Sequence, residues 1–406
     1  MSKEINTAED KNHLVAVLMN TTSAVNRALI YGIIRYVKTY CPWHILLFSS
    51  DYASLRQTDF HQWNVQGIIA DVYTDEVLSL IRSKNVPMLF ANPSQHYLKK
   101  KNFNFENISR IQGNSVKMGE MAADFFLERH FRNFAYIRER KNVEWSQERE
   151  KAFTEQLAQA GYECQSFQPE VQCDDRVVNN FDMPGFVLRQ SLGRWLKALP
   201  KPVALFAASD MYGTQAIDTC RQFNLRCPEE VAILGVDNDT ILCEKTFPAL
   251  SSIARNDEEA GFEGMNHLVQ RITGQTNGPA IISIEPTAII QRHSTFFYDI
   301  QDPVVIQAVN YIITNSDRNL RVDQIARELN VSRRLLEINF RQYLGQSVHE
   351  TIKEHRINII KKLLTETKMT VNEIAVQCEF SSEQYLSQFF KKFTGKTINQ
   401  FRFGIR

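Results

Sequence analysis

Three aspartates stand at or just after apolar runs that predict β-strands: Asp71, Asp210 and Asp237. Ligands of open parallel sheets bind beyond the carboxyl ends of the strands, and a carboxylate there accepts hydrogen bonds from a ligand's donors. These positions therefore predict a ligand-binding site, with Asp210 and Asp237 as its first candidates and Asp71 as the third. The alternative is structural, because an aspartate at this place can simply cap the helix that follows, as Asp210 could before Met211.

Other kinds of chemistry find little support in the sequence. The nine histidines are dispersed, no nucleophile is spaced to pair with a base, and no phosphate-binding loop is present. Glycines 261 and 264 lie inside a helical pattern with no strand before them, so they are not a dinucleotide fingerprint. The seven cysteines form no Cys-x-x-Cys pair and predict reduced core thiols. We expect no catalysis, no cofactor and no metal.

The elements that would position the aspartates alternate regularly from residue 13 onward. Strands are expected at 14–19, 44–48, 67–71, 86–90, 134–137, 203–207 and 231–236. Helices are expected near 24–40, 75–84, 115–130, 147–160, 186–198, 211–223 and 257–272. Short apolar runs that alternate with segments of helical periodicity are typical of βαβ units around a parallel sheet. The body therefore predicts a doubly wound α/β structure.

Length and composition limit the class of protein. A chain of 406 residues predicts two or three domains, and 43% hydrophobic with 23% charged residues is usual for folded proteins. No apolar run approaches the roughly 20 residues that span a bilayer. The polar residues 1–12 lack the basic start and apolar stretch of a secretory signal. We expect a cytoplasmic protein with no membrane segment.

The end of the chain differs from the body in charge and in pattern. Residues 301–406 hold 16 lysines and arginines against 11 aspartates and glutamates, a net charge of +5, whereas residues 1–300 hold 31 against 35, or −4. Strand-like runs stop there, and amphipathic helical segments follow one another. The expected organisation is a tail at 1–12, an α/β domain at 13–292, a connection at 293–301 and an all-α domain at 302–406. A basic helical end favours nucleic acid as its partner.

Two segments of the all-α end share one layout. Residues 322–344 and 371–394 each predict a helix, a turn that ends in serine (Ser332 in the first, Ser381 and Ser382 in the second) and a further helix. The second helices of the two segments begin 50 residues apart, and a long helix at about 347–365 joins the two units. Such a pair could enter successive major grooves, about 34 Å apart. The alternative, that the apolar residues only fill a helical core, is disfavoured by the repeat and by the charge. The inner face of the second unit is expected to contain Leu386, Phe389, Phe390 and Phe393.

The residues of this end resemble the DNA-binding domain of the arabinose-regulator (AraC) family. The matching positions of the second unit are Glu373, Ile374, Ala375, Phe380, Ser381, Tyr385, Phe389, Phe390, Lys391, Lys392, Gly395 and the segment from Thr397 to Arg402. Glu379 departs from the pattern, because the family usually has glycine there. A glycine would take positive φ without strain, so the geometry of this turn is in question.

The resemblance implies which side chains contact DNA. Base-reading residues are expected at Arg333, Arg334 and Glu337 in the first unit, and at Glu383, Gln384, Ser387 and Gln388 in the second. Arginine can bind guanine through two hydrogen bonds, glutamine can do so with adenine, and glutamate can accept from cytosine. Phosphate contacts are expected from Arg341, Lys391, Lys392 and Lys396, and each alone could instead be a solvated surface charge.

The body resembles the regulatory domain of the lactose/galactose repressor family, which is similar to periplasmic sugar-binding proteins. The matching segments are 207–210, 227–238, Gln112 to Asn114 with Gly119 and 122–123, and 148–153, which places Arg149 on the family's ligand-binding arginine. The resemblance covers about residues 13–292. It implies a two-lobed, periplasmic-binding-protein-like (type I) sugar sensor.

A sugar site combines carboxylates, amides, a guanidinium and an aromatic ring that faces the C–H side of the sugar. The residues that supply this mixture are Asn20, Asn26, Arg27, Trp145, Arg149, Asp210 and Asp237. Trp145 could instead serve only in packing within a lobe.

The order of the two resemblances carries the functional expectation. Only 12 residues precede the expected sensor domain, where the repressor family has a DNA-binding headpiece of roughly 60 residues, and the DNA reader follows the sensor in the AraC form. This arrangement resembles that of the xylose operon activators. The resemblance implies a sugar-responsive activator of pentose catabolism genes with D-xylose as effector, acting as a homodimer on paired DNA half-sites and contacting RNA polymerase. Closure of the sensor lobes around the sugar would shift the equilibrium between dimer geometries. The alternatives are another aldose as effector, or a sugar carrier with no regulatory role.

Overall fold

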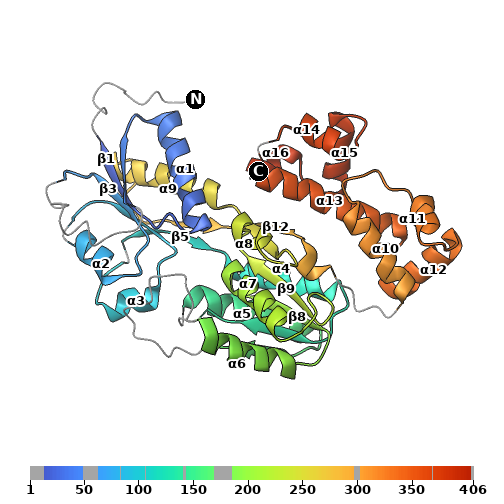
Figure 1. Ribbon diagram of the computed structural model, residues 1–406. Coiled ribbons are helices and arrows are strands. Elements are labelled where there is room, and N and C mark those ends of the chain that lie inside the picture. Colours follow the sequence, from blue (N-terminus) through green and yellow to red (C-terminus); the bar gives the residue numbers. More distant parts are fainter. Residues whose placement is uncertain are drawn as a thin grey trace. The chain divides into compact units, whose positions relative to one another are not determined.

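A computed structural model of the chain (Figure 1) describes residues 13–48, 63–82, 84–105, 107–139, 143–168, 185–296, 302–367 and 369–403. The expected tail at 1–12 and residues 297–301 of the expected connection lie outside this range. Contacts divide the chain into two units. The first comprises Met1–Asn114, Val143–Trp145 and Arg255–Pro286, and the second comprises Ser115–Asn142, Ser146–Ala254 and Thr287–Arg406.

The first unit contains a parallel sheet of six strands. Their spatial order is β11 (Ile281–Ile284), β5 (Ser109–Gly113), β4 (Met88–Ala91), β3 (Gly67–Ala70), β1 (Leu14–Leu18) and β2 (His44–Phe48). Every neighbouring pair is parallel, and Val15 of β1 lies opposite Ile45 on one side and Gly67 on the other. The central strands are continuous apolar runs because apolar clusters cover both faces of the sheet.

The helices of this unit are α1 (Ala24–Tyr40), α2 (Asp75–Arg82), α3 (Gln95–Lys100) and α9 (Asp257–Ile272). Helices α1 and α9 approach each other so closely that only glycine fits at their contact. A Cβ on Gly32 would lie 1.9 Å from the Glu258 carbonyl oxygen, and one on Gly261 would lie 2.1 Å from that of Leu29. Gly261 therefore has a packing role inside its helix.

The second unit contains a six-stranded sheet and an all-α part. The strand order is β12 (Pro286–Ile290), β10 (Ser251–Arg255), β9 (Val231–Val236), β8 (Val203–Ala207), β6 (Phe134–Ile137) and β7 (Cys164–Phe167). Strands β10, β9, β8, β6 and β7 pair in parallel. The accompanying helices are α4 (Ser115–Leu127), α5 (Glu144–Gln159), α6 (Gly185–Ala198), α7 (Asp210–Gln222), α8 (Thr240–Glu244) and the 3-10 helix η4 (His293–Thr295).

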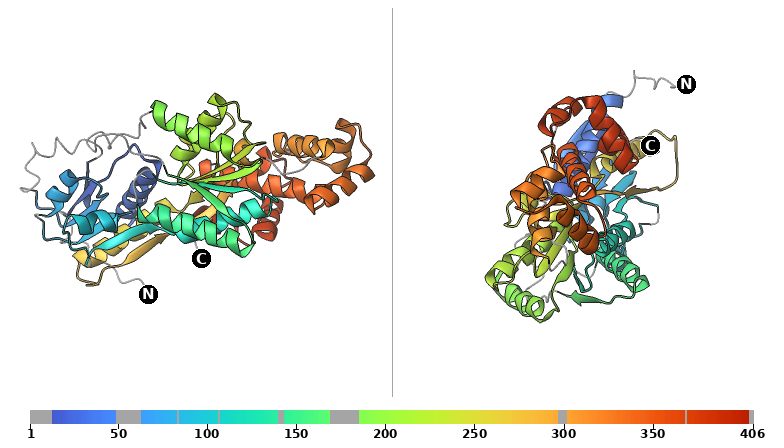
Figure 2. Two further views of the ribbon diagram at one scale, coloured as in Figure 1. Left: turned by 90° about the horizontal axis from the view of Figure 1, so that it is seen from below. Right: turned by 90° about the vertical axis from the view of Figure 1, so that its right-hand side faces the viewer.

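The all-α part, orange to red in Figure 2, has seven helices among the described residues. They are α10 (Pro303–Thr314), α11 (Val322–Glu328), α12 (Arg333–Leu344), α13 (Val348–Glu366), α14 (Val371–Gln377), α15 (Glu383–Thr394) and α16 (Ile398–Phe403). Val348 and Ile352 at the start of α13 belong to the apolar core around α10–α12, and Ile357, Ile360 and Leu364 belong to the core around α14–α16. The long helix α13 is thus shared by both halves.

The predicted fold class is confirmed: two parallel sheets of the type I periplasmic-binding-protein kind precede a helical domain with two helix-turn-helix units. Five strands, β5, β7, β10, β11 and β12, were not expected from the sequence. In the part of the chain that the structure describes, no helix has the length and apolarity needed to cross a membrane.

Candidate functional site

In the first unit, Asn26 and Asp71 meet at the carboxyl end of the sheet. Asn26 lies in the first turn of α1, which Ser23 caps, and Asp71 follows β3 directly. The Asn26 Nδ2 donates to Asp71 Oδ2 at 2.9 Å and to the Asn20 carbonyl oxygen at 3.1 Å. Burial raises the pKa of Asp71 to about 7, and the hydrogen bond from Asn26 offsets this only in part. The structure thus brings the third candidate aspartate next to a predicted amide.

Asn20 and Arg27 shape the loop between β1 and α1. The Asn20 side-chain oxygen accepts from the backbone N–H and the hydroxyl of Thr22, each at 2.9 Å. Arg27 Nη1 donates to the carbonyl oxygens of Thr21 and Thr22 at 2.9 and 2.8 Å. Trp145 is half-buried in the first turn of α5. Asn20 and Arg27 therefore make structural contacts within the loop, besides any contact with a ligand.

Asp210 is a buried carboxylate with three donors from the protein. It is the first residue of α7, and Ser209 is the N-cap, so the alternative that Asp210 caps its own helix is wrong. Ser252 Oγ donates to Asp210 Oδ1 at 2.6 Å, while the Asp239 N–H and Cys243 Sγ donate to Oδ2 at 2.8 and 3.4 Å. Burial, followed by the nearby charge of Asp237, raises the pKa of Asp210 well above its usual range. The carboxylate ties α7 to the loop after β9.

The loop after β9 has an unusual backbone. Asp237 has φ of +108° and Asn238 has φ of +50°, a region that costs energy for residues other than glycine. The Asp237 N–H donates to the Ile253 carbonyl oxygen at 3.0 Å, and the Asn238 N–H donates to Ser252 Oγ at 2.9 Å. Neighbouring strand β10 thus holds Asp237, which is half-buried, in this conformation.

Arg149 reaches the same edge of the second sheet from α5. It is 2% exposed, donates to the Ala208 carbonyl oxygen just after β8 and places Nη2 3.1 Å from Met118 Sδ. Gly119 permits this approach of α4, because a Cβ there would lie 2.5 Å from the Arg149 carbonyl oxygen. The structure therefore brings Arg149 to the end of β8, two residues before Asp210.

One polar pair at this edge was missed by sequence reasoning. Tyr212 in the first turn of α7 donates its hydroxyl to Glu139 Oε1 at 2.8 Å. Glu139 lies two residues after β6, so the same rule that singled out Asp237 could have identified it.

The two helix-turn-helix units match each other in detail. Ser332 and Ser382 are the N-caps of α12 and α15, and each hydroxyl accepts at 3.1 Å from the N–H three residues later. In the turns, Asn330 has φ of +53° and Glu379 has φ of +52°. Glu379 thus adopts the conformation that glycine would favour, and its Oε2 accepts from the Asn319 N–H at 3.0 Å. The departure from the family pattern leaves this turn intact.

The predicted DNA-contacting residues lie on the outer faces of α12 and α15, except Lys396, which follows α15. Exposed side chains are Arg333, Arg334, Arg341, Glu383, Gln384, Gln388, Lys391, Lys392 and Lys396, whereas Glu337 and Ser387 are half-buried. Arg333 Nη1 contacts both carboxylate oxygens of Asp323 at 3.1 Å. Leu386 and Phe390 are buried as expected and Phe389 is partly buried. The placement of Phe393 on the inner face was wrong: it is 42% exposed near the end of α15, with Lys353 and Lys392 beside its ring.

Comparisons with known proteins agree with this architecture. Three family models match: the XylR N-terminal domain at residues 14–109, a periplasmic binding protein-like domain at 123–295 and a helix-turn-helix domain at 325–403. The xylose operon regulatory protein of Haemophilus influenzae is 27% identical over 97% of this chain and 99% of its own length. That of Escherichia coli K12 is 25% identical over 97% of each chain.

Solved structures show the same fold. The structure of the xylose-binding transcription activator xylR aligns with a TM-score of 0.60 at 24% identity, over 97% of this chain and 98% of that one. The complex of the transcriptional regulator CelR with cellobiose aligns with a TM-score of 0.54 at 22% identity, over 70% of this chain and 86% of that one.

These relatives settle the class of protein. The Haemophilus influenzae and Escherichia coli proteins, which align over nearly the whole chain, are transcriptional regulators and not enzymes. The expectation of a sugar-responsive, DNA-binding regulator is confirmed at this level.

Proposed function

We propose that this chain, a homologue of the xylose operon regulatory proteins over nearly its whole length, is a D-xylose-dependent activator of pentose catabolism genes. Residues 13–292 bind the sugar, residues 302–406 bind DNA, and residues 293–301 connect the two. The regulator acts in the cytoplasm as a homodimer on paired half-sites and contacts RNA polymerase. The names of the relatives support xylose as the effector, and the residues at the strand ends support a small polyhydroxylated ligand.

The observation that carries sugar binding is the group of residues at the carboxyl edge of the second sheet. The buried guanidinium of Arg149 lies at this edge together with Asp210 and Asp237, and the backbone of Asp237 is strained. A guanidinium donates and carboxylates accept, which suits hydroxyl groups that do both. Because three protein donors already occupy Asp210, we assign it mainly to fixing the loop of Asp237, which accepts from the sugar.

The first unit also has polar groups at the carboxyl end of its own sheet, and we assign these to sugar binding as well. Asn26 and Asp71 offer an amide and a carboxyl group side by side, with Asn20 and Arg27 in the adjoining loop. Trp145 offers an indole ring for the C–H face of the sugar.

DNA binding is assigned to α12 and α15. Base contacts come from Arg333, Arg334 and Glu337 in the first unit and from Glu383, Gln384, Ser387 and Gln388 in the second. Lys391 and Lys392 contact phosphates. The serine caps place the start of each helix, and the side chains of the first turns are mostly exposed. In this type of domain the first turns of the recognition helix carry the side chains that contact base edges.

A thermal-shift measurement with D-xylose and other pentoses and hexoses tests the sugar site. Ligand at about 100 times its dissociation constant stabilises the folded protein by about 2.7 kcal/mol. We expect Asp237→Ala and Arg149→Ala to lose this shift, because each removes a charged hydrogen-bonding partner worth about 1.5–3 kcal/mol. Asp218→Ala, an exposed position on α7, is the matched control and should keep it.

Each outcome bears on one part of the proposal. A full xylose shift in both variants would show that the sugar binds elsewhere. A shift of the wild type with another aldose alone would replace xylose as the effector, and no shift with any sugar would reject the sensor function.

A further inference from the structure

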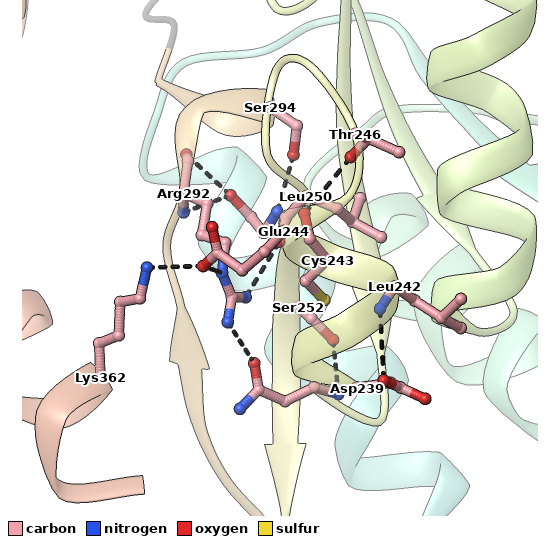
Figure 3. Close-up of polar contacts among 12 residues, drawn as sticks. Asp239, Leu242, Cys243, Glu244, Thr246, Leu250, Ser252, Arg292, Ser294 and Lys362 are labelled. Carbon is pink, nitrogen blue, oxygen red and sulfur yellow. Dashed lines mark hydrogen bonds and ion pairs between the residues drawn. The ribbon is translucent and has the colours of Figure 1, made fainter. Parts of the chain in front are cut away.

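One chain of hydrogen bonds in the second unit runs from the proposed sugar loop to helix α13. Asn238, next to Asp237, accepts from Arg292 Nη2 at 3.0 Å. Arg292 Nε donates to Glu244 Oε1 at 2.8 Å, and the same oxygen accepts from Lys362 Nζ of α13 at 2.7 Å. Figure 3 shows Glu244 between the two cations, at the end of α8.

Arg292 is the fixed centre of this chain. It is 3% exposed and lies between β12 and η4, near the end of the sensor. Each nitrogen of its guanidinium has a partner, with Nη1 donating to the Leu250 carbonyl oxygen at 3.0 Å. The backbone of Arg292 is also held, because its N–H donates to Ser251 Oγ at 2.7 Å. A guanidinium that bonds to three different groups cannot follow one of them without moving relative to the other two.

Glu244 is the exposed step of the chain. Burial acts to raise the pKa of Glu244, but hydrogen bonds from Lys362 and Arg292 outweigh it and hold the pKa below its usual range. The carboxylate is therefore ionised at neutral pH and attracts both cations. Its side chain is 46% exposed, so the pair with Lys362 can be broken without unfolding either partner.

One face of helix α13 contacts the sensor through side chains that are four residues apart. Glu354 accepts from Arg129 at 2.9 Å, Asn358 donates to Gln291 at 3.0 Å, and Lys362 follows one turn later. Ala254, Ala288 and Ile290 of the sensor belong to the same apolar core as Ile357 and Ile360. When the contact of Lys362 changes, those of Glu354 and Asn358 still attach α13 to the sensor, so the helix can shift without detaching.

We propose that the Asn238–Arg292–Glu244–Lys362 chain is the relay by which the occupied sugar site alters DNA binding. Asp237 and Asn238 share a strained turn, so a ligand held by Asp237 changes the hydrogen bond between Asn238 and Arg292. Because α13 contributes to the cores of both helix-turn-helix units, a shift of this one helix moves both recognition helices. The relay rests on the proposed function, since it names the regulation of that same site.

The test measures how much D-xylose changes the affinity of the full-length protein for a duplex selected by that protein from a random pool. Allosteric coupling typically corresponds to a 5- to 150-fold change. We expect Glu244→Gln and Lys362→Met each to reduce the ratio of the two dissociation constants to below about 2-fold. The double variant should lose no more, because the chain is already broken. Lys245→Met removes a charge from the exposed neighbouring position and should keep the wild-type ratio.

A second measurement needs no sugar. Asn238→Gly removes the contact with Arg292 and relieves the positive φ, so hydrogen exchange of the α13 amides should change by at least about threefold. If no aldose affects the wild type, the proposed function fails, while this measurement still decides whether Asn238 is coupled to α13. A wild-type sugar ratio in Glu244→Gln and Lys362→Met, or unchanged exchange in Asn238→Gly, would overturn the relay.

Discussion

The carboxyl group of Asp71 makes stability depend on pH in a direction opposite to that of most acidic groups. Its Oδ2 accepts from Asn26, while Oδ1 is buried with no hydrogen-bond partner among the described residues. Burial raises the pKa of Asp71 from 3.8 to about 7. The folded protein therefore keeps this proton between about pH 4 and pH 7, where the unfolded chain releases it, so stability falls as the pH rises through this range.

The substitution Asp71→Asn removes the titration and keeps an acceptor for Asn26. A difference of about 3 pKa units corresponds to about 4 kcal/mol. We expect about half of this, about 2 kcal/mol, because the residue keeps some exposure and solvent screens its charge. The variant should equal the wild type near pH 4 and exceed its stability by about 2 kcal/mol at pH 8.

Hydrogen exchange of the β3 amides, compared between variant and wild type at each pH, reports this local stability. A gain of 2 kcal/mol slows exchange by about 30-fold. Asp75→Asn is the matched control: hydrogen bonds from Lys101 and Tyr97 lower the pKa of Asp75, so its loss should never stabilise the protein at neutral pH. Equal protection of Asp71→Asn and wild type at pH 8, or the same gain at pH 4 and pH 8, would refute the reasoning.

Two further predictions concern the DNA reader. Arg334→Ala should weaken DNA binding by about 1–3 kcal/mol and relax the preference at one base position. Lys392→Ala should instead weaken binding to all DNA sequences alike and lower the slope of log affinity against log salt concentration by about one. Matching profiles of the two variants in a binding-site selection would mean that the recognition helix is misassigned. Glu379→Gly should be more stable than Glu379→Ala by about 0.5 kcal/mol in urea unfolding. Both substitutions lose the acceptor for the Asn319 N–H, but only glycine relieves the left-handed strain, about 1–2 kcal/mol, which exceeds the cost of added chain entropy, about 0.5–1 kcal/mol. Glu379→Ala keeps the strain and should give no gain, so equal effects of the two substitutions would contradict this account.

Most of the secondary structure could be predicted because its signals are local. Helices α1 and α9 begin and end at the predicted residues, and continuous apolar runs identified β1, β3, β8 and β9. Among the strands that were missed, β10 carries polar residues for reasons that lie elsewhere in the chain. In β10, Ser251 and Ser252 are buried because Arg292 and Asp210 bind their hydroxyl groups. An apolar pattern cannot reveal a strand whose polar groups have distant partners.

The candidate site could be predicted by residue type more readily than by role. The rule that ligands bind after strands selected Asp210, but only the structure shows that Ser252 and the Asp239 N–H already use its carboxylate. Arg292 gave no signal in the sequence, since its partner Asn238 is 54 residues away. Capping and periodicity are local, whereas buried hydrogen bonds join distant segments.

The two turns of the reader show how far a repeat in sequence constrains geometry. Asn330 and Glu379 occupy the same left-handed position, although asparagine adopts this conformation more readily than glutamate does. The turn forms in both cases because the flanking contacts repeat: the N–H of Val331 bonds to the Ala326 carbonyl oxygen at 3.0 Å, and that of Phe380 bonds to Ala375 at 2.8 Å. The backbone hydrogen bond that closes each turn is therefore the same in both units, and the residue within the turn adjusts the stability of the unit.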